Sequence, residues 1–571
     1  MVQAPRFWHG LWVVALLWFA TLFIVNPAGN FPIGDDWSFG LSVQNLIVHH
    51  DYHPVGWAAM SLLTNVLWGS LFCLPVGFSF TALRVSSLAA ALLGIGGTYW
   101  LAKQARQPSW IAMLTALTLG FSPIYYELSN TFMTDVTFTA LVIFSALFLL
   151  KHLQDGGDSD LVIGTIFAVL ATLSRQLALA VPLAFAFSLM LKQGCKVRSL
   201  CRALAPVVVT ISLLALFQHW MAATGRLSGL YSEKSQDLAH AITHPLATAP
   251  YLAYNAYASL IYLGLFLFPV LLCALVALPA PQKKQILPLF GAALWTILLL
   301  LFVFRSHGIF LPLLDGAIME SGFGLRAVYQ AHGTPPLPAL PPLFWRGATC
   351  VGVLGGAGLL AFAAAILRGL ALKLLKPGVR DDREIAAGFL LFSAVIYLFP
   401  VLATPFFYDR YLLPSVPLLA GAIIYLCPPI TIAVDRRITA VAVAVLAALA
   451  VTAVCGTRDL LAWNRTRWQA LDQLMANDHV KPDQIDGGFE FNGFYLYDPR
   501  YHYNGSTRDG WWVRDETYIV TDSLAPGYGV CREYDFSHWM PSYTGRIYVL
   551  KRSGPPAALR SPSSDTKTGQ D

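Results

Sequence analysis

Two adjacent carboxylates, Asp35 and Asp36, lie in the short polar stretch 30–40, which follows an apolar run over residues 11–25. Neighbouring residues in an irregular loop point in different directions, so the two carboxylates are not expected to perform one task together. A carboxylate serves as a general base when it lies within hydrogen-bond reach of the proton that it removes. We expect Asp35 to be such a base. For Asp36 there are two interpretations, a role beside Asp35 or the N-cap of a helix over residues 37–49.

Further polar residues occur where other apolar runs end. Glu127 and Asp135 fall in the stretch 125–135, and their ordinary roles would be a solvated carboxylate and the cap of a helix over 136–150. Asp409 and Arg410 are adjacent, and an internal ion pair that holds two helix ends is the ordinary interpretation there. The remaining polar residues expected on the same side of the membrane are His53, Arg84, Arg175, Arg305 and Arg326.

The composition indicates a protein with many membrane spans. Only 12% of the 571 residues are charged, against roughly 25% in a typical soluble domain. Apolar runs near bilayer length recur from residue 7 to residue 456. The formal net charge of +6 does not point to nucleic acid, because cytoplasmic loops of membrane proteins collect Lys and Arg. We therefore expect a mainly α, polytopic helix bundle in contact with membrane lipids.

The distribution of basic residues predicts the topology. Arg6 before the first span places the N-terminus in the cytoplasm. The segment 54–76 is apolar enough to cross, but counting it as a span would put nearly every basic cluster outside. As a helix in the membrane plane it leaves about thirteen spans of bilayer length. The run 161–191 is interpreted as a re-entrant pair that turns at Arg175, or alternatively as one long tilted helix with a snorkelling arginine.

Two regions follow from this reading. Residues 1–456 form the transmembrane region, with the outer loop and in-plane helices over 26–80. Beyond residue 456 the chain is rich in Trp, Tyr, Asp and Asn, with strand-like patches at 510–514 and 545–550 and a turn signal at 504–505. We predict an extracytoplasmic α+β domain over 457–552 and a disordered tail over 553–571. The tryptophans of this domain would either stack on sugar rings or form its core; they are Trp511, Trp512 and Trp539.

An outer carboxylate among arginines, covered by apolar helices, suits transfer of a sugar from a polyprenyl phosphate. The lipid tail needs a groove, the phosphate needs Arg, which binds its oxygens bidentately, and the acceptor hydroxyl needs a base. The same residue types would suit a transporter or flippase of a lipid-linked or anionic solute. A transporter predicts repeats and broken helices near mid-membrane, whereas no obvious repeat is present here. A scaffold without catalysis is a third interpretation, in which the acidic pair is dispensable.

Several motifs recur in a fixed order along the chain. They are Gly34-Asp35-Asp36, His53-Pro54-Val55-Gly56-Trp57, Phe80-Thr81-Ala82-Leu83-Arg84 leading into Tyr99-Trp100-Leu101-Ala102, Phe121-Ser122-Pro123, Ser129-Asn130-Thr131-Phe132-Met133-Thr134-Asp135 and, later, Asp409-Arg410-Tyr411-Leu412-Leu413-Pro414. This order resembles the GT-C superfamily of membrane glycosyltransferases, and within it the family 39 type, which includes protein O-mannosyltransferases and the aminoarabinose transferases of lipid A. The resemblance covers about the first 190 residues well. It covers the rest of the membrane region loosely and residues 457–571 not at all.

The resemblance implies that Asp35 is catalytic, with Asp36 beside it. The chain has Asp-Asp where the protein mannosyltransferases usually have Asp-Glu, and it lacks their soluble central domain. A lipid or glycan acceptor is therefore favoured over a protein. We expect a hexosyl or pentosyl transferase in a bacterial inner membrane, with its site facing the periplasm.

The mechanism expected from these residues is direct displacement with inversion at the anomeric carbon. Asp35 would take the acceptor proton, and the polyprenyl phosphate would leave toward an arginine that stabilises its charge. The phosphate-binding candidates are Arg84, Arg175 and Arg410, and the supporting polar residues are His53, Glu127, Asp135 and Asp409. No cofactor is demanded by the sequence. A divalent cation, Mg²⁺ or Mn²⁺, between Asp35, Asp135 and the phosphate is compatible with the resemblance.

Overall fold

The computed structural model describes residues 4–324, 337–375, 382–430, 436–501, 511–513 and 515–554. Arg326, the predicted turn at 504–505 and nearly all of the predicted tail lie outside the described residues. The chain divides into two compact units. The first is the helix bundle over residues 1–325 and 338–461, with residues 539–542, and the second is built mainly from residues 462–538 and 543–571.

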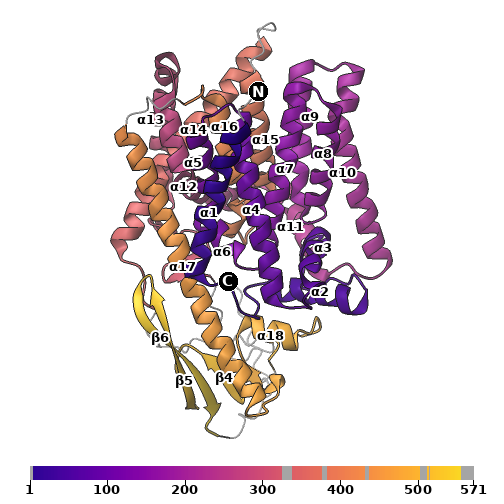
Figure 1. The fold of residues 1–571 in the computed structure, drawn as a ribbon, viewed down its shortest axis with the longest axis vertical. Helices are drawn as coiled ribbons and strands as arrows, with labels where there is room; N and C mark the ends of the chain where they lie inside the picture. Colours follow the sequence, from indigo (N-terminus) through magenta and orange to yellow (C-terminus); the bar gives the residue numbers. More distant parts are fainter. Residues whose placement is uncertain are drawn as a thin grey trace, which may run out of the picture. The chain divides into compact units, whose positions relative to one another are not determined.

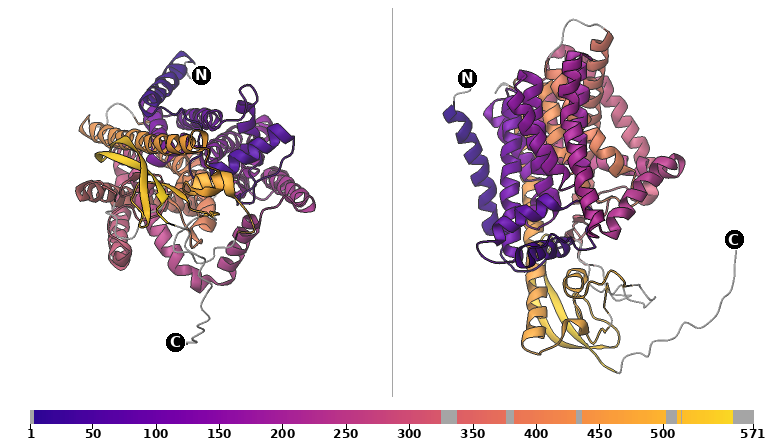
Figure 2. Two further views of the ribbon diagram at one scale, coloured as in Figure 1. Left: turned by 90° about the horizontal axis from the view of Figure 1, so that it is seen from below. Right: turned by 90° about the vertical axis from the view of Figure 1, so that its right-hand side faces the viewer.

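Long apolar helices make up the first unit (Figure 1; Figure 2 gives two further views). The long helices are α1 (Ala4–Val25), α4 (Phe80–Gln104), α7 (Thr134–Asp155), α10 (Val197–Ala223), α12 (Pro245–Ala277), α13 (Ala280–Val303), α14 (Pro342–Leu375), α15 (Asp382–Leu402) and α17 (Arg436–Ala476). Helices satisfy their own backbone hydrogen bonds, which is what a lipid environment requires. The mainly α, polytopic bundle expected from the sequence is confirmed.

The number of spans differs from the expected thirteen. Within the described residues ten helices are long and apolar enough to cross a membrane, or eleven if one bent pair counts as a span. Several apolar segments form shorter helices, among them α3 (Leu63–Cys73), α8 (Asp158–Thr172) and α16 (Ser415–Leu426). At 1.5 Å per residue these rise about 16 to 22 Å, less than the roughly 30 Å of the bilayer core. The count of thirteen is therefore not confirmed.

The segment 54–76 contains no spanning helix. Its regular part is α3, which has 11 residues, and residues 54–62 before it are irregular. This agrees with the prediction that the segment does not cross. The predicted helix over 37–49 is also present as α2 (Asp36–His49). In Figure 1, α2 and α3 lie near each other at one end of the bundle.

The chain turns at Arg175, as the re-entrant interpretation predicted. The segment consists of α8, the 3-10 helix η1 (Gln176–Leu179) and α9 (Ala180–Gln193). Lys192 in the last turn of α9 donates to the carbonyl oxygen of Leu153 near the end of α7, at 2.8 Å. Arg175 instead pairs with Asp135 at the start of α7. Arg175, in the middle of the segment, thus lies at the start of α7, whereas both ends of the segment, Asp158 just after α7 and Lys192 in α9, lie near the end of α7. The segment therefore turns back on itself, and the single tilted helix is excluded.

A bent helix pair carries the first part of the polar stretch 125–135, up to Ser129. Helix α5 (Ser109–Gly120) and helix α6 (Pro123–Ser129) meet at an angle of 65°. Proline lacks an N–H donor, and it is well tolerated at the first position of a new helix. Pro123 therefore starts α6 in a new direction. All seven residues of α6 are buried.

Two helices approach each other through glycine. A Cβ atom on Gly264 of α12 would collide with the backbone at Gly352 and Gly356 of α14. Small residues at such contacts let helix backbones pack closely in membranes. The close contact at these glycines sets the distance between α12 and α14.

The second unit is a small α+β domain, as predicted. A four-stranded sheet has the order β3-β4-β6-β5, with strands β3 (Ile485–Asp486), β4 (Tyr518–Thr521), β5 (Tyr528–Trp539) and β6 (Ser542–Arg552) and helix α18 (Phe489–Leu496). Ile519 of β4 lies opposite Leu550 of β6 in an antiparallel pair. With Ala525 these two residues form a buried apolar cluster.

The strand prediction for this unit is only partly right. Residues 545–550 lie in β6. Residues 511–513 form no strand, so the prediction for the described part of 510–514 is wrong. Trp512 is 6% exposed and packs against Phe489, which supports the core interpretation for this side chain. Trp511 and Trp539 remain 45% and 50% exposed.

Candidate active site

Asp35 is held from two sides. One carboxylate oxygen, Oδ2, accepts a hydrogen bond from Nη2 of Arg410 at 3.1 Å. The other, Oδ1, accepts from the indole Nε1 of Trp57 at 2.9 Å. The side chains of Asp35 and Arg410 are 25% and 20% exposed. The fold thus brings a carboxylate and a guanidinium together across 375 positions of sequence, and both side chains stay partly exposed.

Arg410 lies in a short 3-10 helix, η3 (Asp409–Leu412), between α15 and α16. Its guanidinium carbon is 5.2 Å from the ring centre of Tyr408 and 5.6 Å from that of Tyr411. Burial lowers the pKa of Arg410, but the charge of Asp35 opposes this and the net pKa is raised. Arg410 therefore stays charged and is suited to binding phosphate oxygens.

Asp36 ties two loops together. Its carboxylate accepts from the backbone N–H of Ile33 at 2.5 Å and from that of Phe132 at 3.0 Å. Helix α2 begins at Asp36, and its N-cap position is occupied by Asp35 without a side-chain cap bond. The N-cap prediction for Asp36 is therefore wrong. The residue instead fastens the loop that carries Asp35 to the loop between α6 and α7.

Asp135 and Arg175 form a buried ion pair, in which the bond from Nη2 to Oδ2 is a hydrogen bond and the contact between Nη1 and Oδ1 is a charge contact only. The two guanidinium Nη atoms lie 3.0 and 3.1 Å from the two carboxylate oxygens. Nε of Arg175 donates to the hydroxyl of Thr134 at 2.7 Å. Asp135 lies in the first turn of α7, whose N-cap position is Met133, so Asp135 is not the helix cap. With its donors engaged here, Arg175 is placed to hold the end of α7 rather than to bind a phosphate.

A divalent cation between Asp35 and Asp135 stays a prediction. In the present arrangement each of these carboxylates binds an arginine. Across the described residues there is no group of three or more His, Cys, Asp or Glu side chains that could hold a metal ion.

Arg84 is directed at backbone carbonyls. Its Nη1 donates to the oxygens of Pro27 and Gly29 at 2.6 and 3.0 Å, and its Nη2 donates to that of Phe31 at 3.0 Å. The residue is 1% exposed. This geometry makes Arg84 the anchor of the loop before Asp35, contrary to the predicted phosphate-binding role.

Asp409 does not pair with Arg410. Its two carboxylate oxygens accept from the backbone N–H groups of Ala317 and Ile318, each at 2.8 Å. Burial raises the pKa of Asp409 to about 7, and the hydrogen bonds from these N–H groups oppose the rise. The residue holds the loop after α13 against η3, so the predicted Asp–Arg pair at this position is not formed.

Glu127 is buried rather than solvated. It is 4% exposed and lies on α6, which packs against η3. Among the described residues its Oε2 has no hydrogen-bond partner. The charged groups that act on it are Asp36, Asp135, Asp409 and Arg410.

Two of the predicted residues lie outside this cluster. His53 is exposed, and its carbonyl oxygen accepts from Asn45 Nδ2 at 3.4 Å. Arg305 is exposed and donates to the carbonyl oxygen of Phe302 at 2.8 Å. A residue without a predicted role, Trp57, does contact Asp35. Its signal in the sequence was its place at the end of the motif 53–57.

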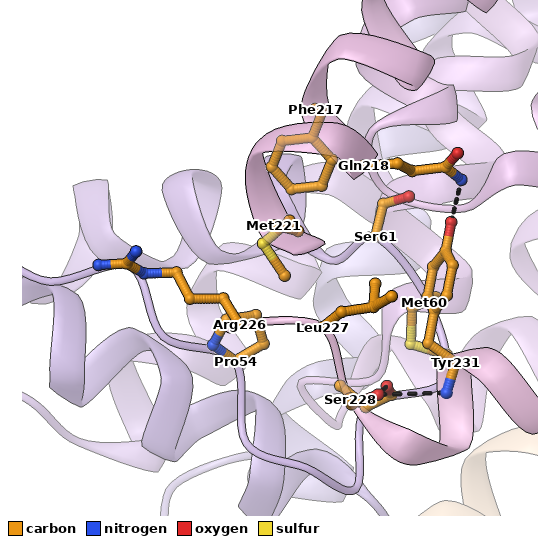
Figure 3. Close-up of a pocket in the computed structure, with 11 residues that line it drawn as sticks. Pro54, Met60, Ser61, Phe217, Gln218, Met221, Arg226, Leu227, Ser228 and Tyr231 are labelled. Atoms are coloured by element: carbon orange, nitrogen blue, oxygen red, sulfur yellow. Dashed lines mark hydrogen bonds between the residues drawn. The ribbon is translucent and has the colours of Figure 1, made fainter. Parts of the chain in front are cut away.

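A small hollow is lined on one side by residues of the segment 54–61, which contains Trp57, and Figure 3 shows the residues around it. Its apolar lining comes from Pro54, Met60, Phe217, Met221 and Leu227. The empty space is ≈ 280 Å³, open solvent included, which is below the 300–1,000 Å³ typical of ligand pockets. It is too small to hold a lipid chain.

Polar contacts around this hollow fix the loop. Ser228 donates to the carbonyl oxygen of Ala58. Arg226 pairs with Asp51 at 2.7 Å, and its hydrogen bond lowers the pKa of Asp51. The segment after α10 thus clamps both ends of the turn that presents Trp57 to Asp35.

A family model matches residues 65–221, and its description is dolichyl-phosphate-mannose-protein mannosyltransferase. The match covers the motifs between residues 80 and 135, whereas those at 34–36, 53–57 and 409–414 lie outside it. It supports a GT-C membrane glycosyltransferase of the family 39 type. A comparison with curated proteins gives no match for this glycosyltransferase-like chain.

Two solved structures are similar to the chain. Both are crystal structures of ArnT from Cupriavidus metallidurans, one in the apo state and one bound to undecaprenyl phosphate. Each shares 14% identity and covers 95% of this chain, and the alignments cover 99% and 97% of the two ArnT chains, with TM-scores of 0.35 and 0.40. A likeness this distant says nothing about substrate or site.

Proposed function

We propose that the protein transfers a sugar from a polyprenyl-phosphate donor to a hydroxyl group of a lipid or glycan acceptor, with inversion, and that Asp35 is the general base. The observation that carries the proposal is the contact between Asp35 and Arg410 at 3.1 Å. It puts a base and a phosphate-binding cation side by side and partly exposed. The donor class is supported by the matching family, whose description names dolichyl-phosphate-mannose.

The proposed reaction is one displacement. Asp35 removes the proton of the acceptor hydroxyl, and the acceptor oxygen attacks the anomeric carbon from the face opposite the phosphate. The bond between that carbon and the phosphate oxygen breaks, and its electron pair leaves with the polyprenyl phosphate. Arg410 stabilises the charge that develops on the leaving group. The proton stays on the Asp35 carboxyl until it is lost to solvent.

The ion pair of the resting site must open for this reaction. While Oδ2 of Asp35 accepts the hydrogen bond from Arg410, that oxygen is not free to take the proton of an acceptor hydroxyl. When the phosphate takes Arg410, Asp35 is freed to accept a proton. Binding of the donor would thus activate the base. We place the protein in a bacterial inner membrane with this site facing the periplasm, as its loops and basic clusters predict.

The test uses the purified full-length protein and a labelled polyprenyl-phosphate sugar, and it measures release of polyprenyl phosphate. Asp35→Asn should reduce release by about 10²- to 10⁴-fold, the usual contribution of a general base, without lowering the melting temperature. Full activity in this variant would remove Asp35 from the mechanism.

The transporter interpretation gives a different result. In proteoliposomes a flippase would move the labelled donor across the membrane intact. The enzyme would release polyprenyl phosphate on one side without moving the donor. Translocation of uncleaved donor by the wild type would contradict the proposed function.

A further inference from the structure

Glu127 carries an unpaired carboxylate oxygen in the interior. The residue is 4% exposed, and Oε2 has no hydrogen-bond partner within the described chain. Burying a carboxylate without a partner is costly. A group that compensates this cost in some state of the protein is therefore expected nearby.

The other acidic residues around Glu127 are already engaged. Asp36 and Asp409 accept backbone N–H groups, and Asp135 is paired with Arg175. Arg410 is a basic residue whose charge acts on Glu127.

Arg410 has a hydrogen-bond donor that could pair with Glu127. Its Nη2 is bound to Asp35, whereas its Nε is buried and, in the described part of the structure, has no hydrogen-bond partner. The elements that carry Glu127 and Arg410, α6 and η3, pack against each other. An unpaired acceptor and an unpaired donor of opposite charge thus belong to neighbouring elements.

We propose that Glu127 is the second carboxylate of Arg410, which receives the guanidinium when it leaves Asp35. A hydrogen bond from Nε to Glu127 would keep both Nη groups available for phosphate oxygens, since the guanidinium has five donors in a fixed fork. Glu127 is then a positioning residue that acts through Arg410 and does not touch the substrate. The consequence for catalysis rests on the proposed function, whereas the coupling of the two residues does not.

The first experiment needs no substrate. Melting temperatures are measured for the wild type, Glu127→Gln, Arg410→Gln and the double variant. In Arg410→Gln the buried Glu127 loses the favourable charge of Arg410, so Glu127→Gln should raise the melting temperature more, or lower it less, in that background than in the wild type, and the two shifts should be non-additive. Ser129→Ala is the matched control. It lies on the same helix, its hydroxyl bonds to the Tyr125 carbonyl oxygen, and its shift should add to that of Arg410→Gln. Additive shifts for Glu127 as well would overturn the proposal.

The second experiment measures binding of undecaprenyl phosphate. Glu127→Gln should weaken binding about tenfold, because a smaller fraction of the protein then has Arg410 away from Asp35. In the Arg410→Gln background the same change should have less than about a twofold effect. Equal losses in both backgrounds would show that Glu127 acts independently of Arg410.

The two hypotheses can fail separately. If the wild type binds no undecaprenyl phosphate, the proposed function is wrong, and the melting-temperature cycle still decides the coupling. If Glu127→Gln does not fold, Glu127→Asp keeps the charge and is measured in the same cycle. The proposal would also be contradicted if the Glu127→Asp variant lost its coupling to Arg410 but still bound undecaprenyl phosphate as tightly as the wild type.

Discussion

Trp57 donates its indole N–H to Oδ1 of Asp35 over 2.9 Å, on the opposite oxygen from Arg410. The bond fixes the direction of the carboxylate, so that opening of the Arg410 pair leaves one oxygen still held and the other available. The indole ring also lies 6.3 Å from that of Trp37 in α2. Orientation of the base therefore depends on a loop residue that is itself packed and clamped.

Replacing Trp57 by Phe should lower the turnover number. The ring is kept and one hydrogen bond to a charged group is lost, which is worth about 1.5–3 kcal/mol and corresponds to about 10- to 100-fold in rate. Donor affinity should change by less than about twofold, since Arg410 is untouched. Initial rates and donor binding are measured on the same preparations.

The control for this variant is Trp68→Phe in helix α3. This change removes an indole hydrogen bond to the carbonyl oxygen of Ser86 in helix α4. It should keep wild-type turnover. A Trp57→Phe variant as active as this control would show that Asp35 needs no orientation from the loop.

Arg84 should behave as a structural residue. Its guanidinium binds three backbone carbonyls and is buried, so Arg84→Gln leaves acceptors unpaired at about 1–3 kcal/mol each. We expect a clear fall in melting temperature, with undecaprenyl phosphate affinity of the folded fraction within about threefold of the wild type. A variant of unchanged stability that fails to bind the lipid phosphate would restore the phosphate-binding role.

The pair of Asp135 and Arg175 should show strong coupling. Removing one partner of a buried ion pair typically costs about 3–5 kcal/mol, because the other charge is left unpaired. Asp135→Asn and Arg175→Gln should therefore each destabilise the protein strongly, and the double variant should lose less stability than the sum of the two single effects. Denaturation midpoints of the four proteins test this. A double variant that loses the full sum would mean that the two residues act separately.

The sequence allowed the helix bundle and the turn at Arg175 to be predicted, because hydropathy and basic loops are properties of short segments. Local motifs also singled out Asp35 and Arg410, which the fold brings into contact, and their roles in catalysis stay predictions. The contacts that assign roles to the polar residues join segments far apart in the sequence, so they could not be predicted in this way. Asp36 binds Phe132 across 96 positions, and Arg84 reaches back 53 to 57 positions to carbonyl groups that have no side-chain signature.

The burial of individual polar residues could not be predicted from the sequence either. Glu127 looks like a loop carboxylate in the sequence, and only the packing of α6 makes it an interior residue. The span count differed for a related reason. An apolar run that ends in a short helix, such as α16, has the composition of a membrane span without its length.

Asp409 provides a test by pH. Its pKa is raised by burial from 3.8 to about 7 in the folded protein. A raised folded-state pKa means that the contribution of this carboxyl to stability is full below about pH 4 and is lost as the pH rises through about 7. Asp409→Asn cannot titrate, so the stability of the wild type relative to this variant should fall between about pH 4 and about pH 7, by at most about 1.4 kcal/mol per pH unit, and should be level at higher pH. Melting temperatures of both proteins across this range measure the effect. If the gap instead widened with rising pH, the N–H groups of Ala317 and Ile318 would outweigh burial, and Asp409 would be a permanent anion that anchors η3 beside Arg410.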